Sequence, residues 1–177
     1  MPNNLSRRDW LRIMGIAAGS SALPLSSLAH NEMGEVIHLP ENLHLNKPAK
    51  AITAITCGAG NRGNVYGNFA VTYPDQLDIV GVAEPIAIRN ERYAKKHNIE
   101  AGNRFNTWEE VFKRPKFADA VIITTPDNLH YGPCMAALEK GYDVLLEKPI
   151  SPSEKECRDI LALAKKKGRI VAVCHVL

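Results

Sequence analysis

The chain has 177 residues, enough for one domain of ordinary size with a short tail. Its apolar fraction of 45% suits a packed core and argues against a disordered chain. The net charge of +3 comes without a basic stripe interleaved with aromatic residues, so nothing in the composition indicates nucleic-acid binding. No apolar run reaches the length of about eighteen residues that a membrane-spanning helix needs, so none is expected.

The first 29 residues resemble a twin-arginine export signal. Paired arginines and an aromatic residue occur in Ser6-Arg7-Arg8-Asp9-Trp10-Leu11-Arg12, and a moderately apolar run follows over 13–28. Ser27-Leu28-Ala29 offers the small residues that signal peptidase reads, so we expect cleavage after Ala29 and export to the periplasm. The alternative is an amphipathic helix that stays attached. Residues 30–50, which include Pro40 and Pro48, predict a linker.

A glycine pattern follows the first apolar, β-branched run, at 51–57. Gly58, Gly60 and Gly63 have the spacing G-x-G-x-x-G, which suits a tight turn from a strand into a helix. Gly58 would permit the turn, Gly60 would let the backbone approach a pyrophosphate, and Gly63 would let the helix pack on the strand. We include Ala59, Asn61 and Arg62 in the same binding loop. An ordinary glycine-rich loop is the alternative, so the context of the pattern has to decide.

The chain after residue 50 alternates strand and helix patterns. Helices are predicted at 62–73, 86–97, from 107, at 129–140 and from 151 to Gly168, and strands at 51–57, 77–83, 104–105, 119–125, 142–146 and 169–174. This alternation predicts a single α/β domain over 51–177, a Rossmann-type doubly wound parallel sheet with strand order 3-2-1-4-5-6. Such a sheet binds ligands at the carboxyl ends of its strands, where the strand order reverses.

Two helices carry clear terminal signals. Thr107 and Glu110 form a capping-box pattern, and Ser151 with Glu154 forms another, with Pro152 in the first turn. In the last helix Cys157, Ile160, Leu161 and Ala164 predict one apolar stripe. Lys165, Lys166 and Lys167 then suit the negative end of the helix dipole, and Gly168 ends the helix.

The four cysteines, Cys57, Cys134, Cys157 and Cys174, are scattered, with no C-x-x-C pair and no metal-like spacing to a histidine. Two fall at the ends of predicted strands and two on predicted helices. We therefore expect thiols in or near the core rather than a disulfide, and we predict no metal site.

An acidic residue follows the second strand. Glu84 lies 26 residues beyond Gly58, where a carboxylate accepts hydrogen bonds from the adenosine ribose hydroxyls. The same charge would repel a 2′-phosphate, so the sequence favours NAD over NADP as the cofactor. Arg62 and Arg89 could accommodate a phosphate, and a solvated turn carboxylate is the alternative for Glu84.

Residues after the fourth and fifth strands are expected at the same edge of the sheet. Thr125 and Pro126 would bring backbone close to the centre of the cofactor, with Asn128 beside them, and His130 would face the crevice from the first turn of a helix. Helix capping is the alternative for Asn128. After the fifth strand, Glu147-Lys148-Pro149 places a cation beside the crevice. Lys148 would orient the nicotinamide or a substrate hydroxyl, or lower the pKa of the group being oxidised; a structural contact to Glu147 or to backbone is the alternative.

Together these residues resemble the N-terminal domain of the Gfo/Idh/MocA family of nicotinamide-dependent oxidoreductases. The resemblance covers residues 50 to 177, and the matching segments are Gly58-x-Gly60-x-x-Gly63, Val82-Ala83-Glu84-Pro85, Thr125-Pro126-x-x-x-His130, Glu147-Lys148-Pro149 and Cys174-His175-Val176-Leu177. It implies hydride exchange between NAD(P) and a sugar, inositol or related polyol, with Lys148 as the catalytic residue. Exported members with a twin-arginine signal are familiar in the family.

The resemblance leaves the reaction open. Some relatives use the nicotinamide for glycoside cleavage without net oxidation, so an NAD-dependent glycosidase is an alternative, and a non-catalytic NAD-binding fragment is another. Family members continue into a second α/β domain, which is absent from this chain and which supplies much of the substrate site and the oligomer interface. We therefore expect the nucleotide half of such an enzyme, from a truncated, split or partial chain, with oligomers if the second domain is present.

Overall fold

The computed structural model describes residues 49–175. The predicted export signal, its cleavage site and nearly all of the predicted linker lie outside the described residues. So do Val176 and Leu177 at the end of the last predicted segment.

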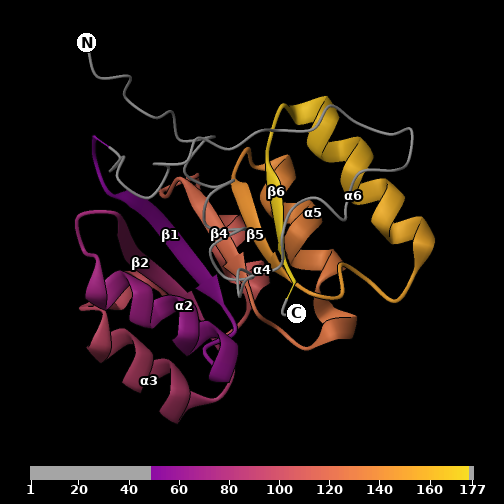
Figure 1. Cartoon of the computed structure of the whole chain (residues 1–177). Coiled ribbons are helices and arrows are strands. Elements are labelled where there is room, and N and C mark those ends of the chain that lie inside the picture. Colours follow the sequence, from indigo (N-terminus) through magenta and orange to yellow (C-terminus); the bar gives the residue numbers. More distant parts are fainter. Residues whose placement is uncertain (1–48, 176–177) are drawn as a thin grey trace, which may run out of the picture.

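The described part is a six-stranded sheet covered by helices. Its strands are β1 (Ile52–Cys57), β2 (Leu77–Ala83), β3 (Arg104–Phe105), β4 (Ala120–Ile123), β5 (Asp143–Glu147) and β6 (Val171–Cys174). All neighbours pair in parallel, in the order β3-β2-β1-β4-β5-β6 (Figure 1). This confirms the predicted Rossmann-type α/β fold and the reversal of strand order between β1 and β4.

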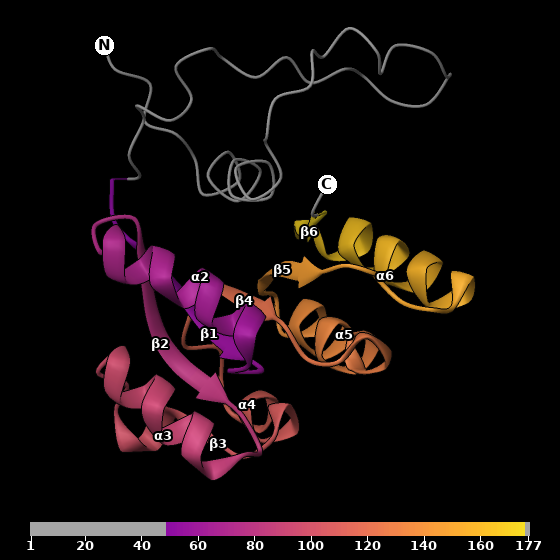
Figure 2. The ribbon, with the colours of Figure 1, turned by 60° about the horizontal axis from the view of Figure 1, so that its bottom comes forward.

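The α-helices are α2 (Asn61–Thr72), α3 (Ala87–Lys96), α4 (Trp108–Lys113), α5 (Tyr131–Glu139) and α6 (Glu154–Lys167). Short 3-10 turns, η3 (Ala101–Asn103) and η4 (Asp127–Leu129), precede β3 and α5. Figure 2 shows α2 and α3 beside β1 and β2, and α5 and α6 beside β5 and β6. Several strands and helices are one to three residues shorter than the sequence predicted, because apolar runs extend past the paired backbone.

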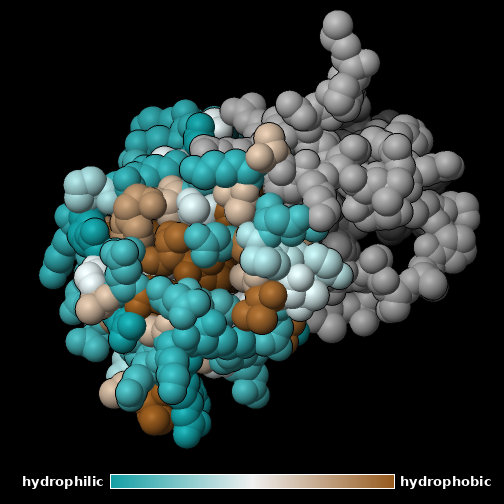
Figure 3. All heavy atoms as spheres, turned by 90° about the vertical axis from the view of Figure 1, so that its left-hand side faces the viewer, coloured by the Kyte–Doolittle hydropathy of each residue, from teal (hydrophilic) through white to brown (hydrophobic). Residues whose placement is uncertain are grey.

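Two apolar clusters lie on the two faces of the sheet. Ile52 and Ala54 of β1 pack with Tyr66 and Tyr93, whereas Ile55 and Cys57 pack with the cluster that contains α5 and α6 residues. Alternate residues of a strand point to opposite faces, so a strand covered on both sides is apolar throughout. All four residues of β4 and all five of β5 are buried accordingly. The face of the molecule drawn in Figure 3 also carries a patch of hydrophobic residues ringed by hydrophilic ones.

The start of α6 corrects one prediction. The chain contains two overlapping Ser-x-x-Glu patterns, and the helix uses the second: Ser153 is the N-cap, and its hydroxyl accepts from the Glu156 N–H at 3.5 Å. Ser151 accepts from the Ser153 N–H at 3.0 Å and donates to the Glu156 carboxylate. Pro152 therefore precedes the helix rather than occupying its first turn.

The rest of α6 agrees with the prediction at all but one position. Ile160 and Ala164 are buried, but Leu161 is 56% exposed and Leu163 takes its place in the buried stripe. The three lysines occupy the last turn, and Gly168 adopts a left-handed conformation at φ 61°. That conformation confirms the predicted helix end, because glycine enters this region without a steric penalty.

The capping box predicted at Thr107 does not form. Thr107 is the N-cap of α4, but its side chain makes no capping bond. The Glu110 carboxylate accepts from the N–H of Asn106, the residue before the N-cap, at 3.0 Å, and not from the Thr107 N–H that a capping box would use. The acidic residues of the first turn still suit the positive end of the helix dipole.

The cysteines are free thiols within the described residues, as predicted. Cys57, Cys134 and Cys174 are buried, and Cys157 is partly buried. Burial raises the pKa of Cys57 to about 12, with a further contribution from Glu109, and burial raises the pKa of Cys134 to about 12. Both thiols therefore stay protonated at neutral pH. Among the described residues, no helix has the length and apolarity to cross a bilayer.

His97, at the end of α3, makes stability depend on pH. Its ring packs at a tilt against Tyr93 with ring centroids 4.5 Å apart, and its Nε2 is buried without a hydrogen-bond partner in the described part of the chain. Burial, followed by the charge of Lys96, lowers the pKa of His97 to about 4. A histidine with a lowered folded-state pKa contributes stability that is complete above its unfolded pKa of about 6.5 and is lost as the pH falls to about 4.

We expect the wild-type chain to lose roughly 1–2 kcal/mol of unfolding free energy between pH 6.5 and 4 through His97, after allowance for partial solvent screening. Urea unfolding at several pH values measures this loss. In His97→Phe, which keeps the ring but not the titration, that part of the pH dependence should disappear. An unchanged pH profile in the variant would assign the acid sensitivity to other groups.

Candidate functional site

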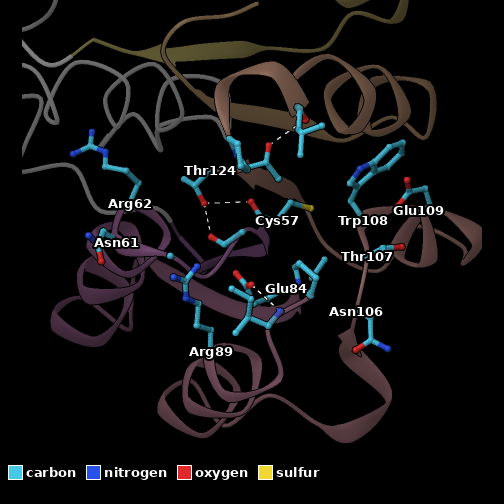
Figure 4. A pocket seen from close by; sticks show the side chains of 18 residues that line it. Cys57, Asn61, Arg62, Glu84, Arg89, Asn106, Thr107, Trp108, Glu109 and Thr124 are labelled. Atoms are coloured by element: carbon cyan, nitrogen blue, oxygen red, sulfur yellow. Dashed lines mark hydrogen bonds between the residues drawn. The ribbon is translucent and has the colours of Figure 1, made fainter.

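A cavity of about 690 Å³ opens at the carboxyl ends of the central strands (Figure 4). Its walls come from the glycine loop, the end of β2, the start of α4 and the segment after β4. The lining residues are Cys57, Gly58, Gly60, Asn61, Arg62, Ala83, Glu84, Pro85, Ile86, Arg89, Asn106, Thr107, Trp108, Glu109, Thr124, Thr125, Pro126 and Leu129. The cavity thus lies at the predicted switch point, between β1 and β4.

The structural requirement for glycine differs among the three glycines of the loop. Gly58 adopts φ 97°, and a Cβ there would lie 2.7 Å from the Thr124 carbonyl oxygen. A Cβ on Gly63 would lie 2.1 Å from the Gly58 carbonyl oxygen. At Gly60, by contrast, the nearest atom to a Cβ is the Arg89 guanidinium at 4.0 Å. The fold therefore requires glycine at two positions, and the open space above Gly60 is left for a ligand.

Helix α2 presents its N-terminus to this cavity. The helix begins at Asn61, one residue before the predicted start, and its N-cap Gly60 has no side chain to satisfy the first amides. No acidic side chain lies in its first turn. Asn64 reinforces the loop by donating to the carbonyls of Ala59 and Gly60 at 3.0 and 2.9 Å. A helix N-terminus of this kind, at the floor of a cavity, suits a phosphate group.

Glu84 lines the cavity and also holds the loop. Its side chain is almost completely buried at the end of β2, and Oε2 accepts from the Ala59 N–H at 2.8 Å. Oε1 accepts from the Ile86 N–H at 3.0 Å. Asn90 fixes the same region by donating to the Glu84 carbonyl. Each carboxylate oxygen keeps a second lone pair, so the predicted contact to ribose hydroxyls remains a prediction that this geometry permits.

The segment after β4 contributes residues that sequence analysis found and one that it missed. Thr125 and Pro126 line the cavity, whereas Asn128 is exposed and lies outside its lining. Thr124, which the sequence did not single out, donates to the Gly58 carbonyl at 2.6 Å. This bond joins the end of β4 to the glycine loop. A threonine directly after a buried strand was the available signal.

His130 is a correction. The sequence placed it in the first turn of a helix, facing the crevice, but α5 begins at Tyr131 and His130 is its N-cap. The ring is 1% exposed. Its Nδ1 lies 2.7 Å from the Pro149 carbonyl oxygen and its Nε2 lies 2.9 Å from the Thr125 carbonyl oxygen. His130 therefore lies between the segments that follow β4 and β5 and is not among the residues that line the cavity.

A second hollow of about 310 Å³ adjoins the first, and its lining residues are Arg62, Thr124, Thr125, Asp127, Glu147 and Lys148. Lys148 is exposed at its edge, and the Lys148–Pro149 peptide bond is cis. Glu147 is buried and accepts from Arg62 Nε at 2.8 Å and from the Tyr66 hydroxyl at 2.6 Å. The alternative of a structural Lys148–Glu147 contact is therefore not what the structure shows, since Glu147 is held by α2.

An apolar wall of the cavity was not predicted. Trp108 at the start of α4 faces the cavity together with Ile86 and Leu129. The indole packs so closely on α5 that a Cβ on Gly132 would lie 2.9 Å from it. Figure 4 shows the Arg89 guanidinium directed into the cavity, while Arg62 lies at its edge. The position of Trp108 depends on how α4 meets α5, which local sequence does not reveal.

Comparison with protein families decides the assignment. Residues 52–175 match the model of an oxidoreductase family described as an NAD-binding Rossmann fold, Gfo/Idh/MocA. The chain belongs to the Gfo/Idh/MocA family. The described residues form the NAD-binding Rossmann domain of that family. The match confirms the family resemblance and the NAD cofactor that the sequence predicted.

Two curated proteins are similar to this chain in sequence. The chain is 31% identical over 123 residues to scyllo-inositol 2-dehydrogenase (NAD(+)) of Bacillus subtilis, which covers 67% of this chain and 33% of the relative. It is 30% identical over 101 residues to scyllo-inositol 2-dehydrogenase (NADP(+)) IolW of the same organism, covering 57% and 27%. The chain thus spans about a third or less of the length of these relatives.

The fold has solved counterparts. The WlbA dehydrogenase from Chromobacterium violaceum, crystallised with NADH and UDP-GlcNAcA, superposes with a TM-score of 0.64 at 20% identity. The match covers 70% of this chain and 35% of that one. At this identity the likeness establishes the shared fold, and the residues of the site are argued from this chain alone.

Proposed function

We propose that this Gfo/Idh/MocA chain supplies the NAD-binding half of an oxidoreductase that transfers hydride between nicotinamide and a sugar or polyol. The observation that carries the proposal is the open space above Gly60, at the N-terminus of α2 and at the floor of the cavity. The names of the two relatives described above, both inositol dehydrogenases, support the substrate class.

The residues of the cavity fit the parts of NAD. The first amides of α2, above Gly60, would receive the pyrophosphate. Glu84 would accept from the adenosine ribose hydroxyls, and the wall of Ile86, Trp108 and Leu129 offers an apolar surface for the adenine ring. Thr125 and Pro126 then lead toward the second hollow, where the nicotinamide end would lie.

Lys148 is the residue that we assign to the chemistry. When bound, NAD supplies the hydride acceptor or donor. The ammonium group of Lys148, at the edge of the second hollow, would donate to the substrate oxygen at the carbon being oxidised. A cation there favours the alkoxide-like charge that develops as the hydroxyl loses its proton.

The first experiment titrates NADH against the purified 177-residue chain, following nicotinamide fluorescence. We expect saturable binding, whereas absence of binding would overturn the proposal. Turnover is then measured with NAD and a panel of inositols and sugars, using the full reading frame if it extends beyond Leu177. Cleavage of aryl glycosides without net formation of NADH would favour the glycosidase alternative. NAD binding without turnover of either substrate class would favour a non-catalytic module.

Glu84 should set the preference for NAD over NADP. In Glu84→Gln the negative charge is lost, together with one of the two acceptors that hold the Ala59 and Ile86 N–H groups. We expect the ratio of NAD affinity to NADP affinity to fall by about tenfold, because the repulsion of a 2′-phosphate disappears. Calorimetric titration with both cofactors measures the ratio, and Glu91→Gln, an exposed residue of α3, is the matched control. Equal losses of affinity for NAD and NADP would show that Glu84 does not determine the choice between the two cofactors.

We also propose export by the twin-arginine route, with residues 1–29 as the signal, 30–50 as a linker and 51–177 as the binding domain. The support is the order of paired arginines, apolar run and Ser27-Leu28-Ala29. Fractionation of cells that produce the chain, compared with Arg7→Lys/Arg8→Lys, tests this. Periplasmic protein that begins at His30, lost in the double variant, is the expected result; equal periplasmic yields would contradict it.

A further inference from the structure

The Glu147-Lys148-Pro149 segment is held on both sides of its lysine. On one side, the buried Glu147 carboxylate accepts from Arg62 Nε at 2.8 Å and lies 2.6 Å from Arg62 Nη2. The same carboxylate oxygen accepts from the Tyr66 hydroxyl at 2.6 Å. Arg62 and Tyr66 both belong to α2, the helix that starts at the glycine loop, so these bonds join the end of β5 to that helix.

On the other side, His130 holds Pro149. Its two ring nitrogens lie 2.7 and 2.9 Å from the carbonyl oxygens of Pro149 and Thr125. The ring is 1% exposed, so water does not compete for these contacts. A neutral imidazole carries one N–H and donates to one of these carbonyls, whereas an imidazolium donates to both and joins the loop after β5 to the loop after β4. The loop after β4 itself reaches the glycine loop through Thr124.

Lys148 lies between the two attachments. Its ammonium group has no hydrogen-bond or ion-pair partner within residues 49–175, and its side chain is exposed at the second hollow. The neighbouring Glu147 carboxylate forms its ion pair with Arg62 and makes none with Lys148. Burial, with help from the Glu147 contact, raises the pKa of Tyr66, so its hydroxyl stays protonated and continues to donate.

We propose that Tyr66 and His130 are positioning residues, which act through Glu147 and Pro149 to hold Lys148 against the nicotinamide end of the cofactor. This inference rests on the proposed function. Tyr66 lies on α2, the helix whose N-terminus would receive the pyrophosphate. The hydrogen bond from Tyr66 to Glu147 therefore connects the phosphate site to the segment that carries Lys148. A cofactor anchored at Gly60 then meets Lys148 at a fixed place.

The test is a double-mutant cycle between Tyr66→Phe and Lys148→Met in the 177-residue chain. Affinities for NADH and for ADP-ribose, which lacks the nicotinamide, are measured by calorimetry. We expect Tyr66→Phe to lower the affinity for NADH about fivefold, the effect of one lost hydrogen bond. The affinity for ADP-ribose should stay within about twofold of the wild-type value. In the Lys148→Met background, Tyr66→Phe should lower the affinity for NADH no further, because the lysine that Tyr66 positions is no longer present.

Tyr131→Phe is the matched control. The Tyr131 hydroxyl also donates to a carboxylate, that of Asp159 at 3.2 Å, but between α5 and α6. This variant should change neither affinity. His130→Gln is the second variant, and it should show the same selective loss of NADH as Tyr66→Phe. Melting temperatures of all variants establish that each is folded under the conditions of the titration.

The outcomes separate the inference from the proposed function. Failure of the wild-type chain to bind NADH would overturn both. If the wild type binds, equal losses for NADH and ADP-ribose in Tyr66→Phe would reduce Tyr66 to a general structural role. Additive effects of Tyr66→Phe and Lys148→Met, or no effect of Lys148→Met on NADH, would overturn the positioning of Lys148 while leaving NAD binding intact.

Discussion

Gly60→Ala is expected to weaken NAD binding tenfold or more while leaving the melting temperature nearly unchanged. A Cβ at this position meets no atom closer than the Arg89 guanidinium at 4.0 Å, and φ is −74°, which any residue adopts. The fold therefore accepts alanine. The cofactor does not, because the methyl group would occupy the space in which the pyrophosphate approaches the first amides of α2. A tenfold loss corresponds to about 1.4 kcal/mol of binding free energy.

Calorimetric titration of NAD and thermal unfolding, carried out on the same preparations, check the two halves of this expectation. Gly102→Ala is the control, since a Cβ there also meets nothing within 4 Å but the residue lies in η3, away from the cavity. It should alter neither quantity. Undiminished NAD affinity in Gly60→Ala would mean that the phosphates lie elsewhere, and the assignment of the glycine loop would be wrong.

The sheet could be predicted from the sequence because its information is local. Strands such as 119–125 read as apolar runs, and parallel strands joined by helices have few permitted topologies. The order β3-β2-β1-β4-β5-β6 followed from that alternation. Helix ends were less secure, as the overlap of Ser151 and Ser153 shows: both fit the capping pattern, and the choice depends on which hydroxyl the neighbouring backbone reaches.

The site was predictable in location but not in the direction of its side chains. Glu84 and Lys148 were expected at the carboxyl ends of their strands, and both line the hollows there. His130 was expected to face the crevice, but its ring is buried against the Pro149 and Thr125 carbonyl oxygens and is not part of the cavity lining. The contact of Arg62 with Glu147 joins residues 85 positions apart. A pairing of that separation is set by tertiary packing and leaves no mark on either local sequence.

Gly63→Ala should have the opposite effect to Gly60→Ala. A Cβ on Gly63 would lie 2.1 Å from the Gly58 carbonyl oxygen, a backbone atom that cannot rotate away and that the Thr124 hydroxyl holds at 2.6 Å. Relief requires α2 to move off β1, which disturbs the buried contacts of Tyr66. We expect a loss of about 3 kcal/mol or more in unfolding free energy, at the upper end of overpacking effects.

Urea unfolding of Gly63→Ala beside Gly60→Ala measures this difference. Unfolding free energies within about 0.5 kcal/mol of wild type for both variants would show that α2 shifts easily, and the close packing would then not explain the third glycine. The results expected for Gly63→Ala and Gly60→Ala would show that two glycines of the G-x-G-x-x-G pattern are required for different reasons. Gly63 is needed for the chain to reach its own fold, and Gly60 is needed once that fold meets a dinucleotide. Stability measurements alone would miss Gly60, and binding measurements alone would confuse the two.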